Sequence, residues 1–210
     1  NLLKSDPSVD LVHFTILRPP EKQDGIPVEE LSLIAFPTRE LFVEKIDEFD
    51  LIIFDRYRIR GILPTYYLEN VRDYVRNGGT VLVSAGPEAG VADSLWRSPL
   101  SEVLPVGVTG RIIEAGYRPV VTDLGRKHPV TEGLEELAPE DGWGRWFRMM
   151  EVTPISGETL MTGPGDRPLL QLAREGEGRV AVLASDHIWL WGRGYEGGGP
   201  HTELLRRLAH

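Results

Sequence analysis

The chain contains no cysteine among its 210 residues. This absence excludes disulfide bonds, thiolate metal sites and a cysteine nucleophile. It leaves the compartment open, because a domain without cysteine is compatible with reducing and with oxidising surroundings. Covalent catalysis by this chain would need another nucleophile.

Positive charge and long apolar runs are also scarce. Lys and Arg number 23 against 32 Asp and Glu, which gives a formal net charge of −9. Nucleic-acid binding needs a concentrated basic face, so we expect no nucleic-acid partner, although a few local arginines could still hold a small anion. No apolar run approaches the roughly 18 residues of a membrane span, and we expect no signal peptide. We therefore expect no membrane contact by this segment itself.

Length and composition predict one domain over residues 1–210, with 41% apolar and 26% charged residues. The chain starts at Asn1 without a Met, and the apolar stripe from Leu204 to Ala209 stops without a C-cap signal. We interpret the chain as a piece of a longer protein.

Strand and helix patterns alternate in the first half. Strands are predicted at 10–17, 50–55 and 80–85, helices at 36–50, with Thr38 as N-cap, and at 64–79, and a loop at 18–30. This alternation predicts a doubly wound, mostly parallel sheet with helices on both faces. Ligands bind such sheets at the carboxyl ends of the strands, where Asp55-Arg56 and Ser84–Glu88 supply polar groups.

The second half has a different pattern. A helix is predicted at 92–105, glycine-turn hairpins at 109–125 and 159–186, a core strand at 178–185, and a helix at the C-terminus. These hairpins predict antiparallel strands that extend one edge of the sheet.

Several segments together resemble a known family. They are "SVDLVHFTILRPPEKQDG", "FDLIIFD", "NGGTVLVSAG", "HPVTEGL" and "GEGRVAVLASDHIWLW". In this order they resemble the class I glutamine amidotransferase-like superfamily, in a branch without the cysteine. The resemblance implies a flavodoxin-like fold, one more core strand before Asn1, and a soluble domain of a large bacterial inner-membrane protein.

Active members of that family have a cysteine at the turn after a strand and a His-x-Glu pair after a late strand. Here the turn falls within Ser84–Pro87, His187 matches the histidine, and Trp189 replaces the glutamate. Glutamine hydrolysis through a thioester is excluded, because an oxygen nucleophile needs a differently built base and oxyanion site.

Two catalytic alternatives remain. Ser84 could be a nucleophile with His187 as base and Asp186 or Asp55 as the orienting carboxylate, or His187 could activate a water. The G-x-S-x-G spacing is absent, and a strand-end serine bonded to backbone is the commoner case. A metal site from Asp186, His187, His201 and His128 lacks any H-x-H or H-x-x-x-H spacing, so we expect no metal and no cofactor.

Ligand-binding candidates lie at two places. At the turn, Gly86 permits the backbone conformation and free N–H groups near Glu88 could face a ligand, with Glu88 favouring a neutral or cationic group. The late glycine-rich stretch offers a stacking surface, made of Trp189, Trp191, Arg193 and Tyr195, and extended by Trp143, Trp146 and Phe147. The plainer interpretation is that these aromatics cap the sheet and pack on the last helix.

The favoured function is therefore a non-catalytic module that binds a small molecule or a protein partner. The alternatives are a hydrolase that uses Ser84 or a His187-activated water, and a purely structural domain. A tether to the bacterial inner membrane is implied by the resemblance; otherwise we expect a cytoplasmic domain.

Overall fold

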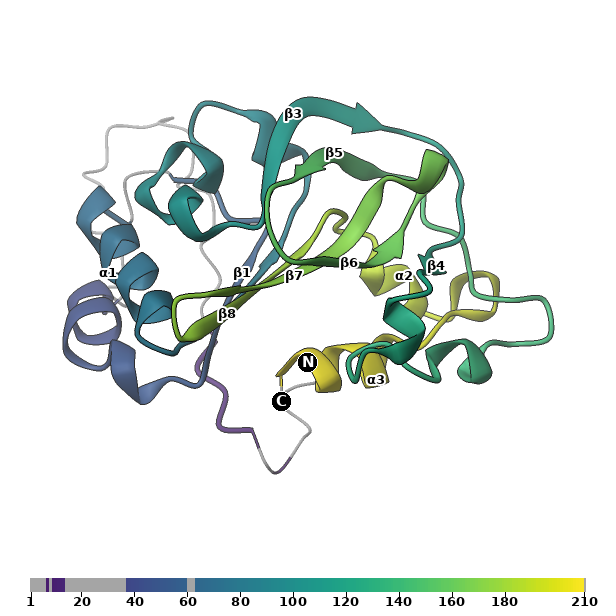
Figure 1. Cartoon of the computed structure of the whole chain (residues 1–210), viewed down its shortest axis with the longest axis horizontal. Coiled ribbons are helices and arrows are strands. Elements are labelled where there is room, and N and C mark those ends of the chain that lie inside the picture. Colours follow the sequence, from purple (N-terminus) through teal and green to yellow (C-terminus); the bar gives the residue numbers. More distant parts are fainter. Residues whose placement is uncertain (1–6, 8, 14–36, 60–62, 210) are drawn as a thin grey trace, which may run out of the picture.

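A computed structural model describes residues 7, 9–13, 37–59 and 63–209. A six-stranded sheet crosses the molecule in the order β1-β2-β8-β7-β6-β4 (Figure 1). Its strands are β1 (Leu51–Asp55), β2 (Thr80–Ser84), β4 (Val120–Val121), β6 (Glu158–Thr162), β7 (Pro168–Glu175) and β8 (Gly178–Leu183). A second, two-stranded sheet pairs β3 (Val106–Ile113) with β5 (Met149–Pro154).

The predicted flavodoxin-like, doubly wound fold is wrong. Only β1, β2 and β8 run parallel, and the pairings of β8 with β7, β7 with β6, and β6 with β4 are antiparallel. The reason lies in the connections, because among the described residues a single crossover helix, α1 (Thr65–Arg76), separates two consecutive parallel strands. From β6 onward, tight turns return the chain directly beside itself, and such turns can join only antiparallel strands.

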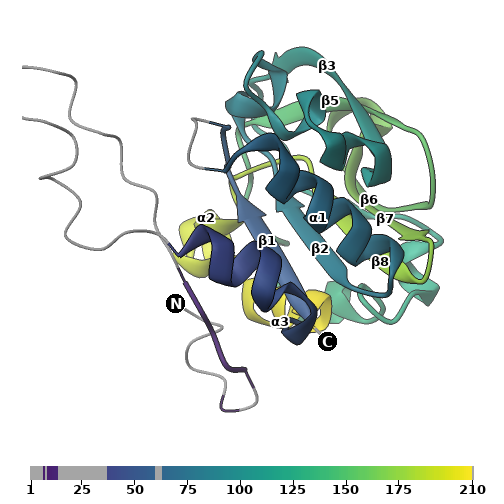
Figure 2. The ribbon, with the colours of Figure 1, turned by 90° about the vertical axis from the view of Figure 1, so that its left-hand side faces the viewer.

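Helix α1 lies over β2 and β8 on one face of the sheet (Figures 1 and 2). As its apolar spacing predicts, it buries Tyr67, Leu68, Val71, Tyr74 and Val75. Tyr74 Oη donates to Phe49 O (2.8 Å) and accepts from Thr80 N (3.2 Å). A Cβ on Gly79 would lie 2.2 Å from the Tyr74 ring, so the glycine at this position allows the helix to pack closely on β2.

Two predicted α-helices are replaced by shorter turns. Within the predicted helix at 36–50, the described residues 37–50 form a π-helical turn, Glu40–Glu44, and a 3-10 turn, Ile46–Glu48, and Thr38 bonds Tyr67 Oη instead of capping a helix. Segment 92–105 forms the 3-10 turns Leu95–Arg97 and Pro99–Val103. Pro99 interrupts an α-helical pattern, because it lacks the N–H that a continuous helix needs.

Some predicted strands also need correction. The hairpin predicted at 109–125 is wrong, because β3 pairs with β5 whereas β4 pairs with β6. The antiparallel succession β6-β7-β8 is confirmed. Residues 10–13 form no strand. The rest of that predicted strand, 14–17, and the predicted loop at 18–30 lie outside the described residues.

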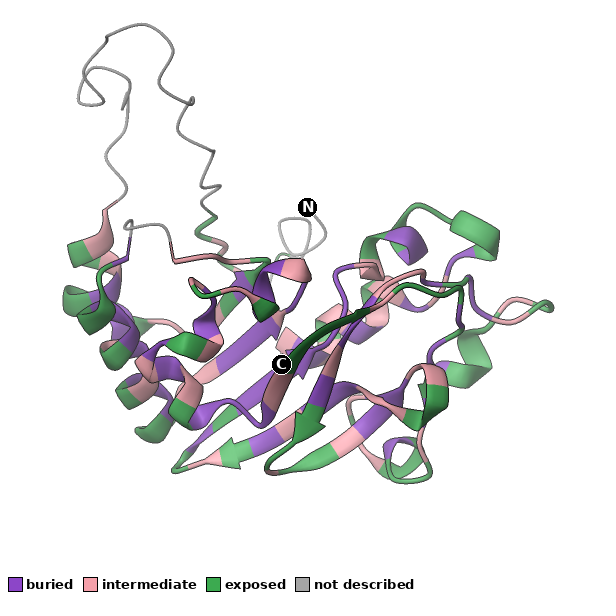
Figure 3. Ribbon diagram, turned by 90° about the horizontal axis from the view of Figure 1, so that it is seen from above, coloured by how far each residue is buried: buried purple, intermediate pink, exposed green. Residues whose placement is uncertain are grey.

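Two short helices end the described chain, α2 (Ile188–Gly192) and α3 (His201–Ala209). Buried residues concentrate along the strands and on the inward side of the helices (Figure 3). No helix among the described residues has both the length and the apolar character required to cross a bilayer.

Candidate functional site

The carboxyl ends of the three parallel strands meet at one edge of the large sheet. Asp55, Ser84 and Leu183 stand in register as the last residues of β1, β2 and β8. The segments that follow bring together Arg56, the turn at 85–88 and the stretch 184–187. Ligands commonly bind at such an edge.

A buried carboxylate organises this edge. The Asp186 side chain is 2% exposed and accepts two hydrogen bonds from Arg148, Nη2 to Oδ2 at 2.7 Å and Nε to Oδ1 at 3.2 Å. Arg56 Nε lies 3.3 Å from the same Oδ2. The hydrogen bonds that Arg148 donates to Asp186 raise the pKa of Arg148, so this guanidinium stays charged. One acidic group therefore fixes two arginines.

Arg56 adopts an unusual backbone conformation. Its φ is +49°, in the left-handed region, which costs a non-glycine residue roughly 1 kcal/mol. Its N–H donates to Ser84 O (3.0 Å), which holds the strained residue beside β2. Glu88 Oε2 also lies 3.8 Å from Arg56 Nε, so that nitrogen stands between two carboxylates.

The outer ends of the two arginines have spare donors. The Arg56 side chain is 55% exposed, and within the described part of the chain neither of its Nη atoms donates a hydrogen bond. Arg148 is 26% exposed, and Asp186 occupies its Nε and Nη2 but not its Nη1. The edge thus presents guanidinium N–H groups to solvent.

His187 is held by the backbone. Its Nδ1 accepts a hydrogen bond from the backbone N–H of Phe147 (3.1 Å). The backbone N–H of His187 donates to Ser185 Oγ (3.1 Å). Burial lowers the pKa of His187; the Asp186 charge opposes this shift and the charges of Arg148 and Arg56 add to it, so the neutral ring predominates at pH 7. With the Nδ1 lone pair in a hydrogen bond, the proton of the neutral ring sits on Nε2. Neither ring nitrogen then has a free lone pair with which to act as a base.

The predicted triad is not assembled in this arrangement. Ser84 lies half-buried in β2, and no hydrogen bond joins it to His187 among the described residues. Asp186 pairs with arginines, and Asp55 is exposed at the end of β1. The Ser185 hydroxyl, in turn, donates to Arg148 O (2.6 Å).

The turn after β2 is closed by its own side chain. Gly86 N–H, which we expected to face a ligand, donates to Glu88 Oε1 (2.7 Å). A Cβ at Gly86 would lie 2.8 Å from both Glu88 carboxylate oxygens, so a larger residue here would displace the Glu88 side chain from this bond. The Glu88 side chain is 9% exposed and consequently offers little negative charge to an incoming ligand.

The aromatic candidates separate into two groups. Trp191 is buried with Trp143 and Trp146, at ring-centroid distances of 5.1 and 4.7 Å, and its Nε1 donates to Gly144 O (2.8 Å). These three rings belong to the core, as the plainer interpretation held. Trp189, Arg193 and Tyr195 are exposed on or just after α2, and the Trp189 ring lies edge-on to His187 at 6.4 Å.

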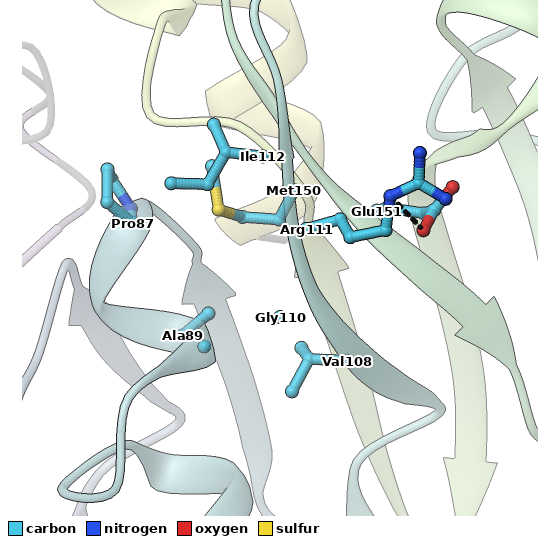
Figure 4. Close-up of a pocket in the computed structure, with 9 residues that line it drawn as sticks. Pro87, Ala89, Val108, Gly110, Arg111, Ile112, Met150 and Glu151 are labelled. Carbon is cyan, nitrogen blue, oxygen red and sulfur yellow. Dashed lines mark ion pairs between the residues drawn. The ribbon is translucent and has the colours of Figure 1, made fainter.

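Two hollows lie elsewhere on the described surface. One, of about 450 Å³, is open and lined by Arg118, Asp141, Arg145 and Glu196. The other is a crevice of about 10 Å³ between the turn at 87–90 and β3, lined in part by Met150 (Figure 4). That volume admits about one water molecule. With its arginine side chain 55% exposed, the Arg56 edge is open to solvent.

Metal ligation finds no support within the described residues, where no three His, Asp or Glu side chains are close enough to hold an ion. His128 Nδ1 instead accepts the N–H of Val130 (3.2 Å). His201 Nδ1 is buried without a partner in that part of the chain, and burial lowers the His201 pKa.

Comparison with known proteins identifies a fold but no family. No protein-family model matches the chain, and no curated protein matches it. Among solved structures, the Salmonella typhimurium cytoplasmic proteins STM3548 and STM1381 superpose with a TM-score of 0.65 each. They are 19% and 21% identical to this chain, cover 84% and 83% of it, and are themselves covered to 75% and 79%.

A cold-adapted β-galactosidase from Rahnella sp. R3 is also similar, with a TM-score of 0.52 and 16% identity. The match covers 79% of this chain but 23% of the galactosidase chain. Identities of this size show a shared fold alone, and a shared fold does not establish a shared function.

The resemblance to class I glutamine amidotransferase-like proteins was wrong. No family model supports it, the most similar structures above are named as cytoplasmic proteins, and the sheet is mixed where that resemblance required a doubly wound one. The order of short apolar segments suggested the family, and such segments occur in many α/β sheets.

Sequence analysis missed the two arginines of the site. Arg56 was noticed only as a polar residue after a strand, and its position at the carboxyl end of β1 was the available signal. Arg148 gave no signal, because its approach to Asp186 depends on how β5 packs across the end of β8. A backbone bond from Met150 N to Ala184 O (2.7 Å) fixes that packing.

Proposed function

We propose that this chain is a module that binds a small molecule at the edge formed by Arg56, Arg148 and Asp186, without hydrolysing it. The observation that supports this most strongly is the buried Asp186 carboxylate, which fixes two partly exposed guanidiniums at the carboxyl ends of parallel strands. Fixed donors of this kind lower the entropy that a binding site loses when its ligand arrives.

The strain at Arg56 supports binding over a purely structural role. A residue at φ +49° is retained where the surroundings require it, and such residues cluster at functional sites. The Arg56 side chain is also 55% exposed although its partner Asp186 is buried, so a ligand can reach the guanidinium from solvent.

The hydrolase alternative is disfavoured by the hydrogen bonds of His187. A general base needs a lone pair directed at the proton that it removes. In His187 the Nδ1 lone pair instead accepts the hydrogen bond from Phe147 N–H. Docking of a protein partner is the second candidate, and it is favoured by the exposed Trp189 and Tyr195 beside the site.

A ligand screen followed by NMR mapping tests the proposal. The purified protein would be mixed with sugars, amino acids, nucleotides and organic acids, and backbone amide shifts would be assigned. We expect shifts at 56, 86–88 and 185–189, and no turnover of ester or amide substrates. Turnover that disappears in His187→Ala and in Ser84→Ala would contradict the proposal.

Location stays a proposal as well. The names of two structural neighbours are compatible with a cytoplasmic module. The tether to an inner membrane remains a prediction, and fractionation of the full-length protein would decide between membrane and cytosol.

A further inference from the structure

We propose that Arg56 and Arg148, held by buried Asp186, bind the oxyanion of a small molecule, either a carboxylate or a phosphate. This inference rests on the proposed function and adds the chemical class of the ligand. It is supported first by the sign of the charge that the site exposes to solvent.

The four charged groups of the site cancel in formal charge but differ in exposure. The carboxylates of Asp186 and Glu88 are 2% and 9% exposed, while Arg56 and Arg148 are 55% and 26% exposed. Asp186 is occupied by the two guanidiniums, and Glu88 accepts the N–H of Gly86. A ligand that reaches the two guanidiniums from solvent therefore meets N–H donors and positive charge, with the exposed carboxylates of Asp55 and Glu114 at the margin of the site. This reverses the expectation that Glu88 favours a neutral or cationic group.

The donors also match the geometry of an oxyanion. A guanidinium binds carboxylate or phosphate through parallel N–H groups, and Arg56 has both Nη atoms available when its Nε faces Asp186. His187 adds a third donor type, because its neutral ring carries a proton on Nε2 within the electrostatic influence of Arg56 and Arg148.

The other arginine hollow gives a useful contrast. There Arg145 directs its Nε, Nη2 and backbone N–H to Glu196, and Arg118 Nε donates to Trp143 O (2.8 Å). The acid there is itself 25% exposed and Asp141 also lines the hollow, so an anion entering it would meet negative as well as positive charge, whereas Asp186 is 2% exposed.

Calorimetric titration with citrate and with inorganic phosphate tests the inference. Because the site is open to water, we expect dissociation constants of about 1 mM at about 0.1 M salt. Arg56→Gln should weaken binding by at least about tenfold, the usual effect of losing charge-assisted hydrogen bonds. Arg145→Gln is the matched control, since Arg145 is similarly exposed, and it should change binding less than about twofold.

Glu88→Gln tests the sign of the ligand independently. Its amide can still accept the Gly86 N–H, but it removes one negative charge, so citrate should bind about threefold tighter. Arg56→Lys checks that a loss in Arg56→Gln comes from recognition and not from misfolding, because Lys keeps the charge without the fork and should give intermediate affinity. Amide spectra of each variant would show whether it is folded.

The outcomes separate the two proposals. Equal affinity of citrate for wild type and folded Arg56→Gln, or weaker binding by Glu88→Gln, would overturn the oxyanion inference. If neutral sugars or amines shift the amides at 56 and 185–189 and the oxyanions do not, the binding module stands and the inference fails. If no probe shifts those amides, both fail. The ratio of the citrate and phosphate affinities identifies the preferred oxyanion.

Discussion

Two arginine–carboxylate clusters flank α2 and distribute their charges differently. In the Asp186 cluster the acid is buried and the arginines are partly exposed. In the Glu196 cluster Arg145 and Glu196 are both partly exposed, and each satisfies the other. The same ion-pair chemistry thus gives two results. A buried acid with two arginines leaves donors directed outward. The exposed one-to-one pair instead ties the loop that carries Glu196 to the segment that carries Arg145.

Burial also decides how much each cluster contributes to stability. An exposed pair is screened by water and salt and contributes little. Removing the acid from a buried cluster leaves uncompensated positive charge in a poorly solvated place, which is costly. The predictions below separate the two clusters on this basis, in order of decreasing effect.

The largest effect is expected for Asp186→Asn. The amide cannot neutralise Arg148 and Arg56, so the free energy of unfolding should fall by about 3 kcal/mol. Urea unfolding measures the change, with Asp123→Asn as control, because Asp123 is fully exposed and pairs with Arg126 at the surface. Equal stability of the two variants would contradict the organising role of Asp186.

A smaller effect is expected at His187. Replacement by Ala leaves Phe147 N–H without its acceptor and should cost about 1–2 kcal/mol. Asn places an oxygen near the former Nδ1 position, so His187→Asn should recover most of this loss. If Ala and Asn are equally destabilising, the ring contributes by packing and not as an acceptor.

The tautomer of His187 gives a direct spectroscopic prediction. Nitrogen-15 shifts at pH 7 should show a protonated Nε2 and an unprotonated Nδ1. Because burial lowers the pKa of His187, its titration midpoint should lie below 6.5. Since the ring binds its proton less readily when folded, stability should decline as the pH falls below about 6.5. A proton on Nδ1, or a midpoint above 6.5, would reopen the hydrolase alternative.

The smallest effect is expected for Glu196→Gln. The hydrogen bonds from Arg145 lower the pKa of Glu196 to about 2, against about 4.3 in an unfolded chain. The pair therefore stabilises the fold above about pH 4.3, and this contribution disappears as the pH falls toward 2. Thermal unfolding should show a small wild-type advantage at pH 7 that shrinks in acid and in 1 M salt. An advantage that is independent of both would argue against an exposed ion pair.

Sequence analysis predicted the local elements better than their assembly. The helix α1, the strands β1, β2 and β8, and the succession β6-β7-β8 followed from apolar spacing and glycine turns. The separation of β3 and β4 into different sheets did not, because it depends on contacts between segments some 40 residues apart. The spacing of apolar residues and the residues of turns report on neighbours in the sequence. They do not determine which distant strands pair.

The site shows the same division. Asp186 and His187 were recognised as chemically capable residues after a late strand, but the partners considered for them in the triad alternative are not the ones they have in the structure. Arg148 reaches Asp186 and Phe147 N reaches His187 only because β5 and the residues directly before it cross the end of β8. A side chain's partner determines its chemistry, and here both partners come from a segment about 40 residues earlier.

Arginine side-chain NMR spectra test the central claim most directly. The Nε–Hε signals of Arg56, Arg148 and Arg145 would be assigned by single substitutions and followed during a citrate titration at constant salt. Our account predicts that Arg56 and Arg148 shift together with one dissociation constant while Arg145 stays in place. Equal shifts at all three, or a shift at Arg145 alone, would show that the buried-acid cluster is not the binding site.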